Sequence, residues 1–576
     1  MLFEVWVPEK TVKLLVAGEE RAMERGDDGW FLLDVPEAGP GTDYAFVLPD
    51  ASSPLPDPRS LWQPHGVHGP SRVYDHSAFA WTDQAWTGKQ LPGSILYEMH
   101  VGTFTPAGTF DGAIERLDHL VDLGVDLVEL LPVNAFNGEY NWGYDGVCWY
   151  APPEPYGGPD GLTRFVDAAH AKGLGVVLDV VYNHFGPSGA YAPMFAPYLS
   201  KHGSNPWGDS VNLDGPLSDE VRRYIADNVL MWLRDYHVDG LRLDAVHALV
   251  DHSAVNLLEQ LAVEVETLSA HLGRPLSLIA ESDLNDPRLI TPREAGGFGL
   301  TAQWDDDVHH ALHTLLTGER QGYYGDFGSL DCLQTVLEGA FFHAGTWSSF
   351  RQRHHGRPVN RMLTPGHRFV AFLQNHDQIG NRAIGDRISA LLSPGLLKVG
   401  ATLLLTGPFT PMLFMGEEWA ASSPWQFFTS HPEPELADAV RTGRRREFAA
   451  HGWASADVPD PQDPATFERS KLDWDELAKP GHAEILALYK RLIALRRQYS
   501  DLSDPWLSQV EVWHGDNFVV IRRGRCVVAA NLAPAPQTVS LRSVPSKVLL
   551  ATSPGVVLQR DRVELPAESA VVVAAR

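Results

Sequence analysis

The chain has 576 residues, which is enough for two to four domains and a large buried core. Its 73 acidic and 46 basic residues leave a net charge of -27 without any long basic run, so we expect no nucleic-acid partner and no docking on an anionic membrane. The first residues, MLFEVWVPEK, lack the pattern of a signal peptide, and no apolar stretch reaches about 18 residues, so we expect a soluble, cytoplasmic monomer.

The first 90 residues carry short alternating runs that end in Gly, Pro or Asp. These runs are FEVWVP, VKLLVAG, WFLLDVP and YAFVLP. Alternation of apolar and polar residues is typical of half-buried strands, so residues 1–90 are predicted to form a β-sandwich. The proline-rich stretch SSPLPDPRSLWQPHG follows these strands and separates them from the next domain.

Residues 91–498 alternate short apolar runs with amphipathic helical segments, which is the pattern of repeated βα units. Eight strands are predicted: SILYEMH, LVELLPV, GVVLDVVYNH, GLRLDAV, LSLIAES, TAQWD, FVAFLQNHD and PMLFMGEE. Eight such units indicate a closed (β/α)8 barrel in an α/β protein. Residues 499–576 return to alternating strands, such as FVVIRR and CVVAANL, and are predicted to form a second β-sandwich.

Reactive groups of such barrels lie at the carboxyl ends of the strands, and four predicted strands end in polar side chains. The third strand ends in Asp179, Asn183 and His184, the fourth carries Arg242 and Asp244, the fifth ends in Glu281, and the seventh ends in Asn375, His376 and Asp377.

Arg242 and Asp244 share one face of their strand, because alternate side chains point the same way. An opposite charge within about 4–6 Å favours the ionised form of a carboxylate, and a nucleophile for an anomeric carbon must be ionised. An ion pair that only stabilises the barrel is the alternative. Glu281 follows the apolar run LSLIA, and apolar surroundings raise a carboxyl pKa, which suits a proton donor.

Asp377 is placed to bind sugar hydroxyls and to favour a positive charge on the ring. A metal site at His376 and Asp377 is the alternative, but neither a second His at i+4 nor a dense Asp/Asn loop accompanies them. Two carboxylates with an oxocarbenium-like transition state are the requirement of glycoside hydrolysis, and these residues predict a retaining enzyme.

Together, these segments resemble the four signature regions of the α-amylase family of glycosidases and transglycosidases. The resemblance implies that Asp244 is the nucleophile, Glu281 the acid/base and Asp377 the third carboxylate. It also implies that further residues bind the substrate or support the site, namely Arg242, His184, His376, Tyr144 (in NWGYD), Asp179, Asn183 and His247. No required metal or other cofactor is implied, because the calcium-binding residues of α-amylases are not evident; full activity after chelator treatment is expected.

Within that family, the segments YEMHVGTFTPAGTFDGAIERL, DGLRLDAVHALVD and LQNHDQIGNR resemble the maltooligosyltrehalose trehalohydrolases. The resemblance implies hydrolysis of the α-1,4 bond next to the trehalose end of maltooligosyltrehalose, with related α-glucans as further ligands. A glucan branching or debranching enzyme is the alternative within the fold, and a non-catalytic glucan-binding protein is the alternative outside enzymes.

A bent terminal disaccharide needs recognition by groups beyond the cleaved bond. The loops after strands five to eight are the expected location of these groups. The candidates are Trp304, Asp305, Gln378, Trp425 and Phe427.

Overall fold

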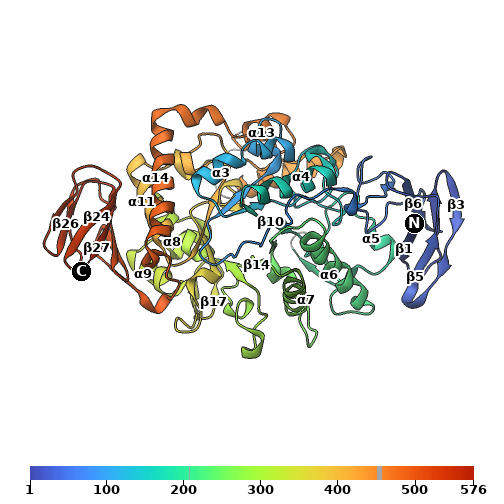
Figure 1. Cartoon of the computed structure of the whole chain (residues 1–576), viewed down its shortest axis with the longest axis horizontal. Coiled ribbons are helices and arrows are strands. Elements are labelled where there is room, and N and C mark those ends of the chain that lie inside the picture. The colour runs from blue at the N-terminus through green and yellow to red at the C-terminus, as the bar shows by residue number, and fades with distance from the viewer. Residues whose placement is uncertain (206–207, 450–456, 576) are drawn as a thin grey trace.

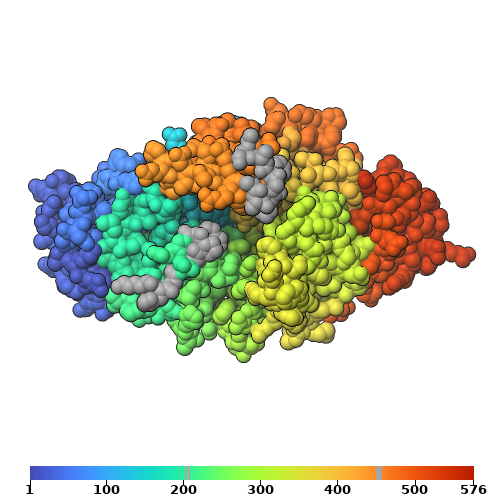
Figure 2. Space-filling view, turned by 180° about the vertical axis from the view of Figure 1, so that it is seen from behind, coloured from blue at the N-terminus to red at the C-terminus, as the bar shows by residue number. Residues whose placement is uncertain are grey.

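The computed structural model describes residues 1–205, 208–449 and 457–575. The chain forms three parts along its longest axis (Figure 1). A β-rich part lies at each end, with the N-terminal one in blue and the C-terminal one in red, and a barrel with its helices lies between them. The view from behind shows the same order (Figure 2).

The N-terminal part is a sandwich of two antiparallel sheets, as predicted. Phe3 and Val5 are buried in the first strand while their neighbours Leu2 and Glu4 are exposed, so alternation places one face in the core. One sheet has the order β1-β5-β4, formed by Leu2–Trp6, Trp30–Asp34 and Glu24–Arg25. The other has the order β3-β2-β6-β7, formed by Glu19–Ala22, Lys13–Val16, Asp43–Val47 and Ser71–Arg72.

The central part is a closed barrel of eight parallel strands, which confirms the predicted fold. Its strands, in barrel order, are β8 (Leu96–Met99), β9 (Leu127–Leu130), β10 (Gly175–Val180), β13 (Gly240–Leu243), β14 (Ser277–Ala280), β15 (Ala302–Trp304), β18 (Phe369–Phe372) and β19 (Thr410–Phe414).

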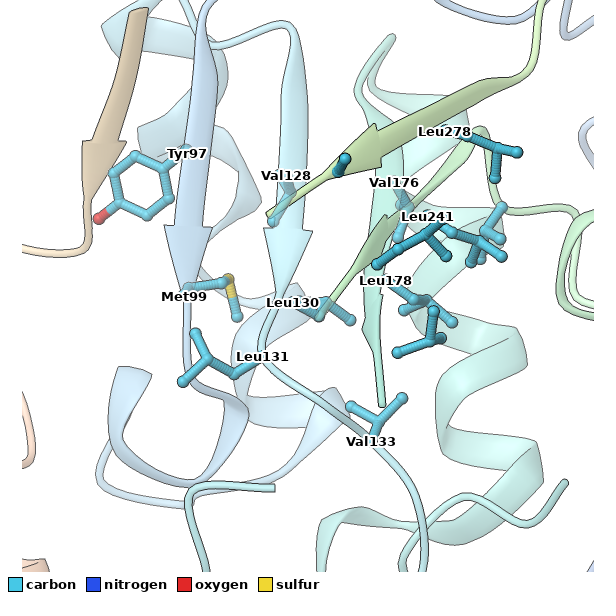
Figure 3. Packing of buried hydrophobic residues seen from close by; sticks show 14 of the residues in the cluster. Tyr97, Met99, Val128, Leu130, Leu131, Val133, Val176, Leu178, Leu241 and Leu278 are labelled. Carbon is cyan, nitrogen blue, oxygen red and sulfur yellow. The ribbon is translucent and has the colours of Figure 1, made fainter. Parts of the chain in front are cut away.

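The two faces of the barrel strands have different chemistry. Side chains such as Tyr97, Val128 and Leu241 belong to the main hydrophobic core (Figure 3). The other face starts with a separate apolar cluster that includes Leu96 and Leu127. Because side chains alternate, the residues two positions later in these strands share that inner face, where they are polar: Glu98, Glu129, and, on the next strand, Asp179.

Helices cover the outside of the barrel, with one exception. The main ones are α3 (Leu117–Leu123), α4 (Gly158–Ala171), α6 (Ser218–Arg234), α7 (Leu257–Leu272), α8 (Asp306–Thr317), α9 (Leu330–Gly339), α11 (Pro394–Thr406) and α14 (Pro480–Gln498). The helix α12 (Pro434–Ala449) instead lies near the carboxyl ends of the barrel strands. Between β14 and β15 the described chain forms only the short 3-10 turns Pro287–Leu289 and Arg293–Ala295. Two prolines and three glycines in residues 281–301 disfavour an α-helix there.

The C-terminal part is also a sandwich, with a five-stranded and a three-stranded sheet. The larger sheet contains β20 (Val510–His514), β21 (Phe518–Arg523), β22 (Cys526–Asn531), β27 (Ser569–Ala575) and β24 (Pro545–Ala551). The smaller sheet contains β23 (Gln537–Ser540), β26 (Arg562–Leu565) and β25 (Val557–Gln559). The domain limits given above, residues 90 and 498, stay predictions.

Among the described residues, no helix is both long and apolar enough to cross a membrane. The three cysteines, Cys148, Cys332 and Cys526, are free and buried, and burial raises the pKa of each thiol.

Candidate active site

Three carboxylates meet at the carboxyl end of the barrel and line one pocket of about 460 Å³. Asp244 directly follows β13 and Glu281 directly follows β14. Asp377 lies in the first turn of a short helix, α10 (His376–Gly380), which begins where Asn375 accepts a hydrogen bond from the Gln378 amide at 2.7 Å. The side chains of Asp244, Glu281 and Asp377 are 13%, 16% and 42% exposed, so all three carboxylates can be reached from the pocket.

Arg242 is buried beside two of these carboxylates, Asp244 and Glu281. Its Nη1 donates to Asp244 Oδ1 at 2.8 Å and to both oxygens of Asp179 at 3.0 and 2.8 Å. Its Nη2 is 3.7 Å from Glu281 Oε2, and the guanidinium lies 4.2 Å from the centre of the Trp304 ring. The predicted ion pair with Asp244 is therefore present, and one fully buried guanidinium holds Asp244 and Glu281 at the same barrel end.

Asp244 is oriented through both of its oxygens. Arg242 binds Oδ1, and Asn183 Nδ2 donates to Oδ2 at 2.7 Å. The next residue, Ala245, has φ of 40°, in the left-handed region that costs a residue with a β-carbon of order 1–3 kcal/mol. In this conformation the Ala245 amide donates to Glu281 Oε2 at 2.5 Å. The residue next to the candidate nucleophile thus helps to position the carboxylate of the candidate acid.

Burial raises the pKa of Glu281, the charges of Asp244 and Asp377 raise it further, and Arg242 opposes them. The direction agrees with the prediction from the apolar run before Glu281. A carboxyl with a raised pKa stays protonated closer to neutral pH, which is the property of a general acid.

Aromatic and histidine side chains surround the pocket floor. The Tyr144 hydroxyl donates to Asp179 Oδ2 at 2.6 Å and lies 2.8 Å from His376 Nε2, with the two rings stacked. His184 Nε2 donates to the Tyr144 carbonyl at 2.9 Å. His247 also lines the pocket, with Nε2 3.9 Å from Asp283 Oδ1. These predicted residues lie together, whereas Asp179 and Asn183 lie below the pocket and support it.

Three predicted substrate contacts are wrong in detail, because Trp304, Asp305 and Trp425 are at most 2% exposed. Trp304 packs inside the barrel against Arg242, and Trp425 packs against Trp142. The Asp305 carboxylate caps the first turn of α8, accepting from the Val308 amide at 3.4 Å. Buried side chains of this kind cannot contact a sugar in the pocket, so they act through packing or helix capping.

The other two candidates lie at accessible positions. Phe427 lines the pocket itself. The Gln378 amide oxygen accepts from the hydroxyls of Tyr323 and Tyr324 at 3.4 and 3.3 Å. These tyrosines line a second pocket of about 570 Å³, which shares Asn381 and Glu447 with the first. Gln378 is therefore placed beside an extension of the site.

Several lining residues are missing from the sequence prediction. The α12 side chains Val440, Arg444 and Glu447 form one wall, and Arg444 lies over the Phe427 ring at 5.1 Å. Exposed Phe350, on the turn between β16 (Thr346–Ser348) and β17 (Arg353–His355), lines the second pocket. No sequence motif marks these positions. They reach the site only because the folded chain places segments that are distant in sequence beside the barrel strands.

Within the described part of the chain, no group of three or more His, Cys, Asp or Glu side chains has the arrangement of a metal site.

Comparison with known proteins gives two family matches. Residues 73–196 match the catalytic domain of α-amylase, and residues 505–572 match a domain of unknown function, DUF3459. Among curated relatives, a malto-oligosyltrehalose trehalohydrolase of Arthrobacter ramosus is 58% identical over 93% of both chains. Another, from Rhizobium sp. (strain M-11), is 55% identical over 99% of this chain and 97% of the relative.

Solved structures show the same architecture. A provisionally named α-amylase from Salmonella typhimurium superposes with a TM-score of 0.91 at 40% identity and covers 100% of this chain and 97% of that one. A pullulanase from Anoxybacillus sp. LM18-11 superposes with a TM-score of 0.75 at 18% identity, covering 100% of this chain and 86% of that one, and shows the fold alone.

Proposed function

The chain belongs to the malto-oligosyltrehalose trehalohydrolases, glycoside hydrolases of the α-amylase family, and from this premise we propose that it cleaves the α-1,4 bond next to the trehalose end of maltooligosyltrehalose. The products are free trehalose and a shorter maltooligosaccharide. The observation that supports this proposal most is the pocket in which Asp244, Glu281 and Asp377 meet at the carboxyl end of the barrel.

The reaction proceeds in two steps with retention at the anomeric carbon. Asp244 attacks that carbon while Glu281 gives its proton to the departing glycosidic oxygen, so the carbon–oxygen bond breaks as the glycosyl ester forms. Trehalose leaves, and Glu281 then removes a proton from a water that attacks the ester carbon. The sugar is released with Asp244 again ionised and Glu281 again protonated.

The contacts of the two carboxyl groups fit these roles. Arg242 Nη1 and Asn183 Nδ2 each donate to one oxygen of Asp244, which holds the carboxylate in place for attack. Burial raises the pKa of Glu281, which favours the proton donor. Asp377, the most exposed of the three, is free to accept hydrogen bonds from ring hydroxyls and to favour the positive charge of the transition state.

The trehalose end is proposed to bind on the side of Glu281, because the acid lies next to the leaving group. His247 and Asp283 lie on that side, and Arg351 Nη2 donates to Asp283 Oδ2 at 2.9 Å. The guanidinium of Arg351 lies 5.8 Å from the ring centre of Phe350, which faces the second pocket together with Tyr323. Two exposed aromatic rings at this position offer flat surfaces for a bent disaccharide.

Product analysis tests the substrate. The enzyme is given maltopentaosyl-trehalose, linear maltohexaose and amylopectin in separate reactions, and trehalose, glucose and branch points are measured. Rapid release of trehalose from the first substrate is expected, with slow cleavage of the second. A change of branch content without trehalose release would instead identify a branching or debranching enzyme.

The substitution Asp244→Asn tests the mechanism. Loss of the nucleophile is expected to lower kcat by about four orders of magnitude or more, by analogy with removal of nucleophiles in other hydrolases. Asp219→Asn, at an exposed position in the first turn of α6 and outside both pockets, is the control and is expected to keep most of kcat. Unchanged turnover in Asp244→Asn, with deamidation excluded by mass spectrometry, would refute the mechanism and would leave a binding protein as the alternative.

A further inference from the structure

Glu98, at the inner face of the first barrel strand, is a buried carboxylate that the proposed mechanism does not use. Its side chain is 1% exposed. Both of its oxygens accept hydrogen bonds from the same residue: Oε1 lies 2.5 Å from His376 Nδ1, and Oε2 accepts from the His376 amide at 3.0 Å. Glu98 therefore fixes the ring of His376 and the start of α10, the helix that carries Asp377.

The hydrogen bonds around His376 determine its protonation. The Tyr144 hydroxyl has a single proton, which it donates to Asp179 Oδ2 at 2.6 Å. Both Asp179 oxygens also accept from Arg242 Nη1, so they act as acceptors. Burial raises the pKa of Asp179 to about 7, and the charge of Arg242 opposes that rise. The Tyr144 oxygen, 2.8 Å from His376 Nε2, is thus left as an acceptor, and Nε2 must carry hydrogen. Nδ1 must carry hydrogen as well, since its partner is the carboxylate Glu98.

We propose that Glu98 is a positioning residue that keeps His376 doubly protonated, so that an imidazolium lies at the floor of the active site beside Asp377. His376 Nε2 is 3.6 Å from Asp377 Oδ1, so the charge of the imidazolium attracts this carboxylate and helps to hold it in place at the pocket. The inference rests on the proposed function, because Asp377 is taken as the third carboxylate of the glycosidase.

Charges on several elements act on His376. Burial lowers its pKa, but the charges of Asp377 and Glu98 raise it to about 9, while Arg242 opposes them. The titratable and charged groups that face it are Glu98, Glu129, Asp179, Arg242, Tyr144, His100 and Asp377. If Glu98 is not an anion, it is mainly the charge of Asp377 that offsets the effect of burial on the pKa of His376. The pKa is then expected to fall, so that the imidazolium loses its second proton near neutral pH.

Glu129 provides a matched control on the adjacent strand. It pairs directly with Glu98 in the register of β8 and β9 and is equally buried. Within the described chain, neither of its carboxyl oxygens has a hydrogen-bond partner. Burial raises the pKa of Glu129 well above its usual range, and the nearby charge of Glu98 adds to this effect, so Glu129 is a neutral acid. Its change to Gln removes no charge, whereas the same change at Glu98 removes one.

The test is the ratio of wild-type to variant kcat/KM for maltopentaosyl-trehalose as a function of pH. For Glu98→Gln we expect the ratio to rise by about tenfold or more between pH 5.5 and pH 8.5, because His376 loses its proton and the alkaline limb moves to lower pH. For Glu129→Gln we expect a ratio near one throughout. A ratio for Glu98→Gln that does not vary with pH would show a merely structural role and would overturn the proposal.

A second measurement serves if Glu98→Gln does not fold. The double variant Glu98→Gln/His376→Gln buries no unmatched charge, and it is compared with His376→Gln alone. If Glu98 acts through His376, the two variants have the same kcat/KM; a further loss of tenfold or more in the double variant would contradict the proposal. Failure of the proposed function is seen separately, as absence of trehalose release by the wild type.

Discussion

At the scale of single residues, Phe350 offers the sharpest test of how the trehalose end is selected. Phe350 is 53% exposed and lines the second pocket. We expect Phe350→Ala to lower kcat/KM for maltopentaosyl-trehalose by about tenfold or more and to change that for maltohexaose much less, since a lost contact surface affects only the substrate that uses it.

Trp347 gives the control for this prediction. It lies on β16 of the same hairpin, is 56% exposed and lines neither pocket. Trp347→Ala is therefore expected to leave the ratio of the two kcat/KM values unchanged. Equal losses on both substrates in Phe350→Ala would place the trehalose end elsewhere.

The sequence alone could predict those site residues that directly adjoin barrel strands, such as Asp244 and Glu281. Their strand positions fix where they point, and the apolar run before Glu281 predicts its raised pKa. It could not predict the burial of Trp425, because the rings that cover it come from segments far away in the chain. The partnership of Glu98 with His376 was equally hidden, since 278 residues separate them.

At the scale of elements, the eight strands were predictable because each is a short apolar run ended by polar residues. The missing helix between β14 and β15 could have been predicted as well, from the prolines and glycines of residues 281–301. The role of Asp305 as the cap of α8 could not have been predicted, because it depends on the conformation of the turn before the helix. By capping the first turn of α8, Asp305 stabilises the fold locally.

If Asp305 caps α8, its removal lowers the stability of the protein. Asp305→Ala is expected to lower the free energy of unfolding by about 1 kcal/mol, because the first turn of α8 loses its cap. Asp305→Asn, which keeps an oxygen acceptor, is expected to lose less. Urea unfolding followed by circular dichroism measures both. A change in substrate preference without any loss of stability would restore the original assignment of Asp305 to substrate binding.

At the scale of the whole molecule, a buried cluster joins the segment before the barrel to the end of the barrel opposite the active site. His170 on α4 lies between two carboxylates, with Nδ1 2.8 Å from Asp83 and Nε2 3.0 Å from Asp239. Trp86 stacks on His170, and its Nε1 donates to Asp239 at 2.8 Å. Asp83 and Trp86 belong to the connection after the N-terminal sandwich, so this cluster holds that connection against β10 and β13.

The cluster makes stability depend on pH. Burial lowers the pKa of His170, but Asp239 and Asp83 together raise it above its usual value. Stability from this imidazolium is thus fully present below the unfolded pKa of about 6.5 and is lost as pH rises through the folded pKa. Although burial raises the pKa of Asp83, His170 and His237 lower it overall, so its contribution is present above about pH 4 and is lost in acid.

His170→Gln tests this account. It removes the cation that lies between two buried carboxylates, but Asp83 keeps His237 at 2.9 Å and Asp239 keeps Arg274 at 3.0 Å. We therefore expect it to lower the free energy of unfolding by about 2 kcal/mol at pH 6, the range for a lost hydrogen bond to a charged group. The loss is expected to shrink toward pH 9, where the wild-type imidazole approaches its neutral form. His271→Gln, at an exposed position in the last turn of α7, is the control and is expected to change stability little at either pH. Urea midpoints at both pH values decide: an equal loss at pH 6 and pH 9 would mean that His170 contributes through packing and neutral hydrogen bonds, and that its charge does not stabilise the junction between the sandwich and the barrel.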